Sequence, residues 1–307
     1  MLAYPIGSLG QPWGEAEKAS WQNATEIQRS YQSLVVDRVF ALSGRFSVAV
    51  YGALSHDPLR YPLYALETLS PDPELPWVLV TGGVHGYETS GVFGALSFLE
   101  RSAQSYQNHF NFLVLPCISP WGFETINRWN IATIDPNRSF KEDGLCEEAR
   151  FVIRFLACMQ REFIMHIDLH ETTDTDESEF RPALAAKLGQ RYEPTEIPDG
   201  FYLVGDSNNP QSSFQAAIVS AVSEITHIAP NDAKGRLLGD IAAQRGVVNY
   251  AYRSLGLCAG VTNAPYTTTT EVYPDSASIT PDECIDAQVC ALEAGLTFIS
   301  SVDALED

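Results

Sequence analysis

Short apolar runs alternate with helix-forming segments along most of this chain, and this alternation constrains the fold more than any other feature. Residues 77–81 form a nearly all-apolar run that two glycines end, which is typical of a strand covered on both faces. Further strands are predicted at 46–51, 61–66, 112–115, 163–170 and 266–272, with helices at 88–101, 147–159 and 281–302 and interrupted helix within 14–42. This order predicts an α/β fold with a mixed, mostly parallel central sheet and helices on both faces.

The sequence shows no internal repeat and no linker, so we expect a single domain over residues 1–307. An acidic, proline-containing stretch at 174–200 and a polar stretch at 205–213 are typical of insertions into such a domain. Apolar residues make up 45% of the chain, which is enough for a buried core and excludes intrinsic disorder. We expect no membrane-spanning helix, because no apolar run approaches the roughly 20 residues that one needs.

The charge balance of the chain limits its partners. With 39 acidic and 19 basic residues, a net charge of -20 would repel nucleic acid and anionic membranes, so neither is an expected partner. Six cysteines without a Cys-x-x-Cys pair predict reduced thiols rather than a disulfide scaffold. The first residues lack the basic start and apolar centre of a secretion signal, and the expected location is therefore the cytoplasm.

Two histidines and a carboxylate follow strands in an arrangement typical of metal ligands. His85 and Glu88 lie where the run 77–81 gives way to a helix, and His170 ends a later strand. Ligand sites in such sheets lie at the carboxyl ends of strands, so these three side chains are predicted to bind one metal ion. Two nitrogens and a carboxylate suit zinc, with a fourth position left for water.

The strand that His170 ends carries two more polar side chains. A period of two places His166 and Asp168 on the same face as His170. The pair has three interpretations: they support His170, they line the cleft, or they form part of a second metal site. The third is the least favoured of these.

On these residues, and on others between them, the sequence resembles the zinc carboxypeptidases of the M14 type. That family places its ligands as His-x-x-Glu after a strand and a lone His at the end of a later strand, which matches His85, Glu88 and His170. Between them it carries an Arg and then Asp-x-Asn-Arg, matched here by Arg128 and by Asp135-Pro136-Asn137-Arg138. The resemblance implies the fold of that family, one zinc ion per chain, and the removal of C-terminal residues from peptides.

The resemblance also implies a role for each intermediate residue. Arg128 would stabilise the oxyanion of the tetrahedral intermediate. Asn137 and Arg138 would hold the terminal carboxylate of the substrate, for which a guanidinium fork is a suitable partner. Asp135 would accept a hydrogen bond from the ring nitrogen of His85 that does not bind metal.

The C-terminal part of the chain adds the last family elements. Glu271, near the end of the strand 266–272, matches the general base of the family. The tyrosine that caps the substrate in that family corresponds to Tyr250 or Tyr252, and the sequence does not decide between them. Where many members have Asn-Pro-Asp-Gly, this chain has Ser119-Pro120-Trp121-Gly122, so a reshaped cleft is expected.

Other functions compete with the peptidase. Enzymes of the aspartoacylase and succinylglutamate desuccinylase group share these elements and hydrolyse N-acyl amino acids. They carry a further β-rich domain after the catalytic glutamate, whereas most of the chain after Glu271 is predicted to be one helix, which favours the peptidase. A binding protein without activity is disfavoured because every motif residue is retained. The expected partner is thus a peptide or small amide with a free carboxylate, and the oligomeric state is not predicted.

A run of acidic residues directly follows His170, and it has two interpretations. The run comprises Glu171, Asp174, Asp176, Glu177 and Glu179. If these carboxylates face the cleft, peptides with a C-terminal Lys or Arg should be preferred. If they form a solvated loop, as charge runs usually do, they have no role in substrate choice.

Overall fold

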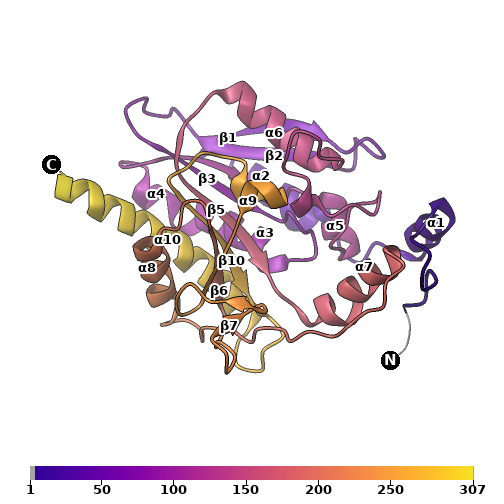
Figure 1. The fold of residues 1–307 in the computed structure, drawn as a ribbon. Coiled ribbons are helices and arrows are strands. Elements are labelled where there is room, and N and C mark those ends of the chain that lie inside the picture. The colour runs from indigo at the N-terminus through magenta and orange to yellow at the C-terminus, as the bar shows by residue number, and fades with distance from the viewer. Residues whose placement is uncertain (1–3, 307) are drawn as a thin grey trace.

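An eight-stranded mixed sheet forms the centre of the molecule in the computed structural model, which describes residues 4–306 (Figure 1). The ends of the predicted domain, residues 1–3 and Asp307, lie outside the described part. The strands are β1 (Phe46–Ala53), β2 (Pro62–Thr68), β3 (Trp77–Gly82), β4 (Asn111–Leu115), β5 (Phe163–Glu171), β6 (Tyr202–Asp206), β9 (Val247–Tyr250) and β10 (Tyr266–Val272). A two-stranded hairpin of β7 (Arg236–Leu237) and β8 (Asp240–Ile241) stands beside the sheet.

The strand order β1-β2-β4-β3-β5-β10-β6-β9 gives the sheet a parallel centre. β4, β3, β5 and β10 are parallel neighbours, and β9 is parallel to β6. The pairs β1-β2, β2-β4 and β10-β6 are antiparallel. The predicted α/β class with a mixed, mostly parallel sheet is therefore confirmed.

Helices cover both faces of this sheet (Figure 1). They are α1 (Glu15–Ala24), α2 (Asp37–Ala41), α3 (Thr89–Arg101), α4 (Ala103–Tyr106), α5 (Pro120–Thr125), α6 (Glu147–Met159), α7 (Arg181–Lys187), α8 (Ser212–Val222), α9 (Tyr252–Leu255) and α10 (Pro281–Glu306). Val78 and Val80 of β3 pack in the core cluster that contains side chains of α3, α8 and α10, whereas Leu79 packs in the cluster that contains those of α6. Burial on both faces explains why the run at β3 is almost entirely apolar.

Helix α10 corrects one expectation. Its segment Pro281–Val302 is long and apolar enough to cross a membrane, although we expected no such segment from the sequence. In this fold α10 packs against α3 and α8, and its residues Leu292, Leu296 and Ile299 are fully buried. Its composition is that of a core helix.

The region between β5 and β10 holds more regular structure than predicted. The stretch 205–213, expected to be a polar loop, contains the end of β6 and the start of α8, and the stretch 174–200 contains α7. Both β6 and β9 belong to the central sheet and were not predicted. β6 has only five residues, and the turn-forming sequence Ser207-Asn208-Asn209-Pro210 follows it directly, so the local sequence indicates a loop rather than a strand.

Candidate active site

His85, Glu88 and His170 meet where β3 and β5 end. Their ligand atoms all lie within 4.8 Å of one another, and all three side chains are buried. Both histidines turn the same ring atom inwards: His85 Nδ1 is 2.7 Å from Glu88 Oε1, and His170 Nδ1 is 2.6 Å from Glu88 Oε2. The structure thus brings the three predicted ligands into one cluster of metal-binding groups.

Two glycines allow the elements that carry this cluster to approach one another closely. A Cβ atom at Gly91 of α3 would lie 2.3 Å from the carbonyl oxygen of Leu169 in β5. A Cβ atom at Gly86 would lie 2.0 Å from the backbone nitrogen of Phe123 in α5. Since real side chains do not fit at such distances, Gly91 allows the start of α3 to lie against β5, and Gly86 allows the His85 turn to lie against α5.

The outer nitrogen of each histidine has a carboxylate partner. His85 Nε2 lies 2.9 Å from Asp135 Oδ1, and His170 Nε2 lies 2.7 Å from Asp168 Oδ2. Carboxylates at these nitrogens can accept the Nε2 proton of each ring, which is the arrangement that leaves Nδ1 to bind a metal ion beside Glu88. Glu88 Oε2 is buried without a hydrogen-bond donor among residues 4–306. The Nδ1 atoms of the two histidines and the carboxylate of Glu88 are then all electron-pair donors that face one another, an arrangement that suits a cation bound between them.

The electrostatics of the cluster also favour a cation. Although burial opposes it, Glu88 and Asp168 raise the pKa of His170 well above its usual range. Burial likewise opposes ionisation of Glu88, yet His170 and His85 lower its pKa to about 2. The shift of His170 reports the negative charge of two carboxylates beside it, and the shift of Glu88 keeps that carboxylate ionised and able to bind a cation.

Arg128 is held beside this centre by two carboxylates. Its Nε donates to Asp135 Oδ2 at 3.1 Å, and its Nη1 donates to Asp176 Oδ1 at 3.3 Å. Asp176 also accepts a hydrogen bond from the hydroxyl of Tyr87. The side chain of Arg128 is 20% exposed and borders the cleft. Asp176 was not predicted as a site residue, since nothing in the sequence distinguishes it from the other members of the acidic run.

The carboxylates of that acidic run each have a partner within the chain. Glu171 accepts from the backbone of Thr89 and Ser90, Asp174 from Tyr273, Asp176 from Tyr87, Glu177 from Arg181 and Glu179 from Tyr4. Among the described residues, only Asp176 and Glu177 of this run pair with a cation, Arg128 and Arg181 respectively. Glu171 and Asp176 line the cleft, so the preference for C-terminal Lys or Arg stays a prediction.

The Asn-Arg pair reaches the cleft from the short helical turn Pro136–Arg138. Asn137 is buried, its Oδ1 accepts from the backbone of Cys258 at 2.7 Å, and its amide nitrogen lies 3.4 Å from His170 Nε2. Arg138 is exposed and donates to the carbonyl of Asn137 at 2.7 Å. It has no carboxylate partner among the described residues, so its fork remains available to a ligand.

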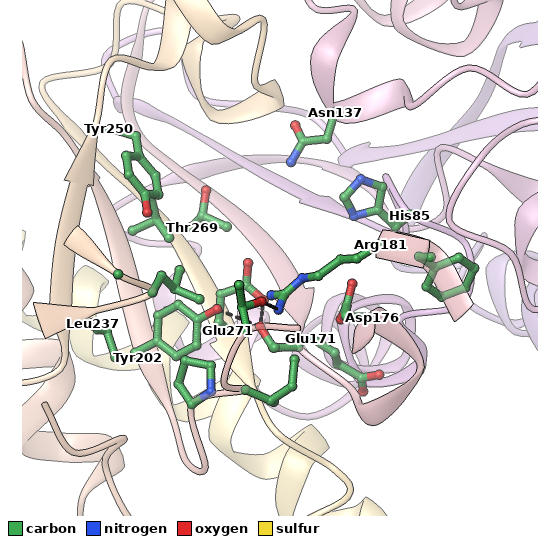
Figure 2. A pocket seen from close by; sticks show the side chains of 18 of the residues that line it. His85, Asn137, Glu171, Asp176, Arg181, Tyr202, Leu237, Tyr250, Thr269 and Glu271 are labelled. Carbon is green, nitrogen blue, oxygen red and sulfur yellow. Dashed lines mark hydrogen bonds between the residues drawn. The ribbon is translucent and has the colours of Figure 1, made fainter. Parts of the chain in front are cut away.

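The structure separates the two candidate tyrosines. Tyr250 lines the cleft, and its hydroxyl donates to Asp240 at 2.9 Å (Figure 2). Tyr252 is 1% exposed, donates to the carbonyl of Val204 and does not line the cleft. Only Tyr250 is placed where it can contact a substrate.

Glu271 stands next to the metal-binding cluster. In the parallel pairing of β10 with β5 it lies opposite His170, and it accepts a hydrogen bond from Thr172 Oγ1 at 3.0 Å. Burial raises the pKa of its carboxyl to about 8, with Glu88 adding to the shift and His170 opposing it. A carboxyl group that titrates near neutral pH can both accept and return a proton.

Most of these groups, His170 and Tyr252 excepted, border one cleft of about 1070 Å³. Figure 2 shows His85, Asn137, Tyr250 and Glu271 around the same space. One wall comes from α7 and the other from the β7-β8 hairpin, both part of the region that was poorly predicted. This volume suits a short peptide or a small amide.

We compared the chain with known proteins and solved structures. No protein-family model and no curated protein matches the chain. A protein from Shewanella amazonensis SB2B, provisionally assigned as a metallopeptidase, matches in structure with a TM-score of 0.63 and 21% identity, over 89% of this chain and 98% of that one. A metallo-carboxypeptidase from Burkholderia cenocepacia matches with a TM-score of 0.59 and 15% identity, over 95% of this chain and 70% of that one.

A third solved structure extends the likeness to animal proteins. Bovine thrombin-activatable fibrinolysis inhibitor, in complex with tick carboxypeptidase inhibitor, has a TM-score of 0.56 and 14% identity, and covers 95% of this chain and 98% of that one. The chain therefore has the fold of the metallo-carboxypeptidases, as its resemblance to the M14 type predicted.

Proposed function

We propose that this protein is a zinc-dependent carboxypeptidase that removes C-terminal residues from peptides. The observation that carries the proposal is the His85, Glu88 and His170 cluster, of which His85 and Glu88 line the same cleft as Glu271 and Arg138. A metal centre, a proton acceptor and a carboxylate receptor are the three parts that such a hydrolysis requires. The metallo-carboxypeptidase fold supports the same activity.

The residues of the cleft divide the chemistry among them. His85, Glu88 and His170 would hold the zinc ion, a Lewis acid that lowers the pKa of a bound water toward neutral pH. Glu271 takes the proton of the attacking water and returns it to the leaving amine. Arg128 donates hydrogen bonds to the oxygen on which negative charge develops. Asn137 and Arg138 hold the terminal carboxylate, which places the last peptide bond beside Glu271.

The metal is the first part to test. Purified protein should hold one zinc ion per chain, measured by mass spectrometry of the metal, and His170→Ala should weaken zinc binding by more than the ~10- to 100-fold typical of losing only an outer hydrogen-bond partner. His109→Ala is the control, because this histidine is exposed and distant in sequence from the cluster. Zinc binding that survives in His170→Ala would contradict the assigned ligands.

The carboxylate receptor predicts exopeptidase action. Converting the C-terminus of a peptide to an amide should lower kcat/KM by at least ~100-fold, because it removes the charged partner of Arg138. Matched acid and amide peptides measure this ratio, and Arg138→Ala should reduce it to near one. Arg236→Ala, which removes a cation from the opposite wall of the cleft, should leave the ratio unchanged. Equal cleavage of both peptides by the unaltered protein would contradict the proposal.

A panel of N-acyl amino acids belongs in the same experiment. These compounds also carry a free carboxylate beside an amide bond, so Arg138 could hold them equally well. Faster hydrolysis of N-acyl amino acids than of any peptide would replace the carboxypeptidase with the deacylase. The zinc measurement is common to both enzymes and does not distinguish them.

A further inference from the structure

A chain of buried polar side chains lies beneath His170, on the core side of the metal-binding cluster. Thr81 of β3 stands opposite Asp168 of β5 in the parallel register of these strands. Thr81 Oγ1 is 2.6 Å from Asp168 Oδ1 and 3.0 Å from His166 Nε2. None of these three side chains is accessible to solvent. They therefore have only one another and the adjacent protein groups as partners.

Counting donors fixes the direction of these hydrogen bonds. An ionised carboxylate only accepts, so the single hydroxyl proton of Thr81 points at Asp168. The oxygen of Thr81 then accepts from Cys258 Sγ at 3.7 Å and faces His166 Nε2 at 3.0 Å. A second acceptor at that nitrogen would be unfavourable, which places the ring proton of His166 on Nε2. His166 Nδ1 is left as an acceptor, 3.4 Å from the hydroxyl of Thr262. Burial lowers the pKa of His166 to about 4, and the ring is neutral as this pattern requires.

The chain continues into the metal-binding cluster through the second oxygen of Asp168. That oxygen lies 2.7 Å from His170 Nε2. While it accepts the Nε2 proton, Nδ1 keeps its lone pair and faces Glu88. The orientation of His170 thus depends on where Asp168 is held. Thr81 hydrogen-bonds to Asp168 directly, and His166 acts on it through Thr81.

We propose that Thr81 and His166 are positioning residues, which fix Asp168 and through it the ring of His170 for metal binding. This inference rests on the proposed function only in requiring that the cluster binds a metal. The other histidine is supported differently, since Asp135 is held by the positive charge of Arg128 at the edge of the cleft. His85 therefore depends on a support that includes the charged Arg128, and His170 on one formed by the neutral, fully buried side chains of Thr81 and His166.

The position of this chain in the core argues against a role in packing alone. A buried hydroxyl and a buried imidazole both carry a desolvation cost that an apolar side chain of similar shape would avoid. Val78 and Val80 fill neighbouring positions of β3 with such side chains. Polar groups at Thr81 and His166 are explained if their hydrogen bonds orient Asp168.

Threonine variants give the first test. Thr81→Val keeps the shape and removes the hydroxyl, and zinc affinity, measured by competition with a chromogenic chelator, should fall by ~10- to 100-fold. Thr81→Ser restores the hydroxyl and should restore the affinity. Thr268→Val is the matched control, because Thr268 is a buried threonine of β10 whose hydroxyl donates to Gln215 and not to the cluster. Its zinc affinity should equal that of the unaltered protein, even if its unfolding temperature falls.

Histidine variants provide a second test should Thr81→Val fail to fold. The amide of glutamine can donate from a position like that of Nε2, whereas leucine cannot. His166→Gln should therefore bind zinc nearly as tightly as the unaltered protein, and His166→Leu more weakly. Unfolding temperatures of the metal-free variants separate loss of affinity from loss of stability.

Two results would overturn the inference. One is an unchanged zinc affinity in both Thr81→Val and His166→Leu. The other is a loss of zinc affinity in Thr268→Val as large as that in Thr81→Val, which would show that the effect is not specific to the hydroxyl that contacts Asp168. Failure of the proposed function gives a different result: a protein that binds zinc and cleaves no peptide loses the carboxypeptidase assignment, while the affinities of the variants still decide the role of Thr81 and His166.

Discussion

Replacing Arg128 with alanine should lower kcat by about 100- to 1000-fold, with KM changed much less. Asp135 and Asp176 accept hydrogen bonds from two nitrogens of the guanidinium, and the Arg128 side chain is 20% exposed at the edge of the cleft. A donor fixed in advance gains most from the charge that develops on the carbonyl oxygen in the transition state. Its loss therefore appears in turnover rather than in substrate binding.

The measurement needs two controls. Zinc content must be determined for Arg128→Ala, because Asp135 supports His85 and loses its own partner in this variant. Arg128→Lys keeps the positive charge without the planar fork, so its kcat should lie between those of the alanine variant and the unaltered protein. Arg101→Ala, an exposed arginine paired with Asp286, should change neither constant. If Arg128→Ala altered KM alone, the residue would bind substrate and not the oxyanion.

The metal-binding cluster could be predicted because its signals are local in the sequence. The His-x-x-Glu spacing follows an apolar run ended by glycines, and the period of two in β5 places His170 on a defined face. Strand ends meet at one edge of a parallel sheet, which brings these positions together without knowledge of the loops. The same logic predicted that Asp168 shares a face with His170.

Contacts that depend on register or on loop paths could not be predicted. Thr81 meets Asp168 only because β3 and β5 pair in one particular register, and no pattern within either strand encodes it. Asp176 reaches Arg128 from the helical turn Asp176–Phe180, and it is one of five acidic residues in this part of the sequence, each of which takes a different partner. Hydrophobic periodicity carries no information on either contact.

The same limit applies to the walls of the cleft. α7 and the β7-β8 hairpin are short, so neither shows a sustained hydrophobic period. Their side chains nevertheless form much of the cleft surface, including Leu184 on one wall and Leu237 on the other. Substrate preference is therefore the property that the sequence predicts least well.

Glu271→Gln should keep zinc and lose at least ~100-fold in kcat, the lower limit expected for the loss of general base catalysis. Glutamine has nearly the shape of glutamate and can still accept the hydrogen bond from Thr172, so the strand end and the neighbouring His170 should keep their positions. It cannot take a proton from water or return one to the leaving amine.

A matched variant separates proton transfer from a general loss of negative charge in the cleft. Glu196→Gln removes another carboxylate that lines the cleft and should leave kcat close to that of the unaltered protein. Zinc affinity should be the same in both variants, because neither side chain belongs to the metal-binding cluster. Normal turnover in Glu271→Gln would show that another group moves the proton. A loss of zinc in that variant would instead show that Glu271 is a metal ligand. We do not expect this result, although Glu271 lies opposite His170 on the neighbouring strand.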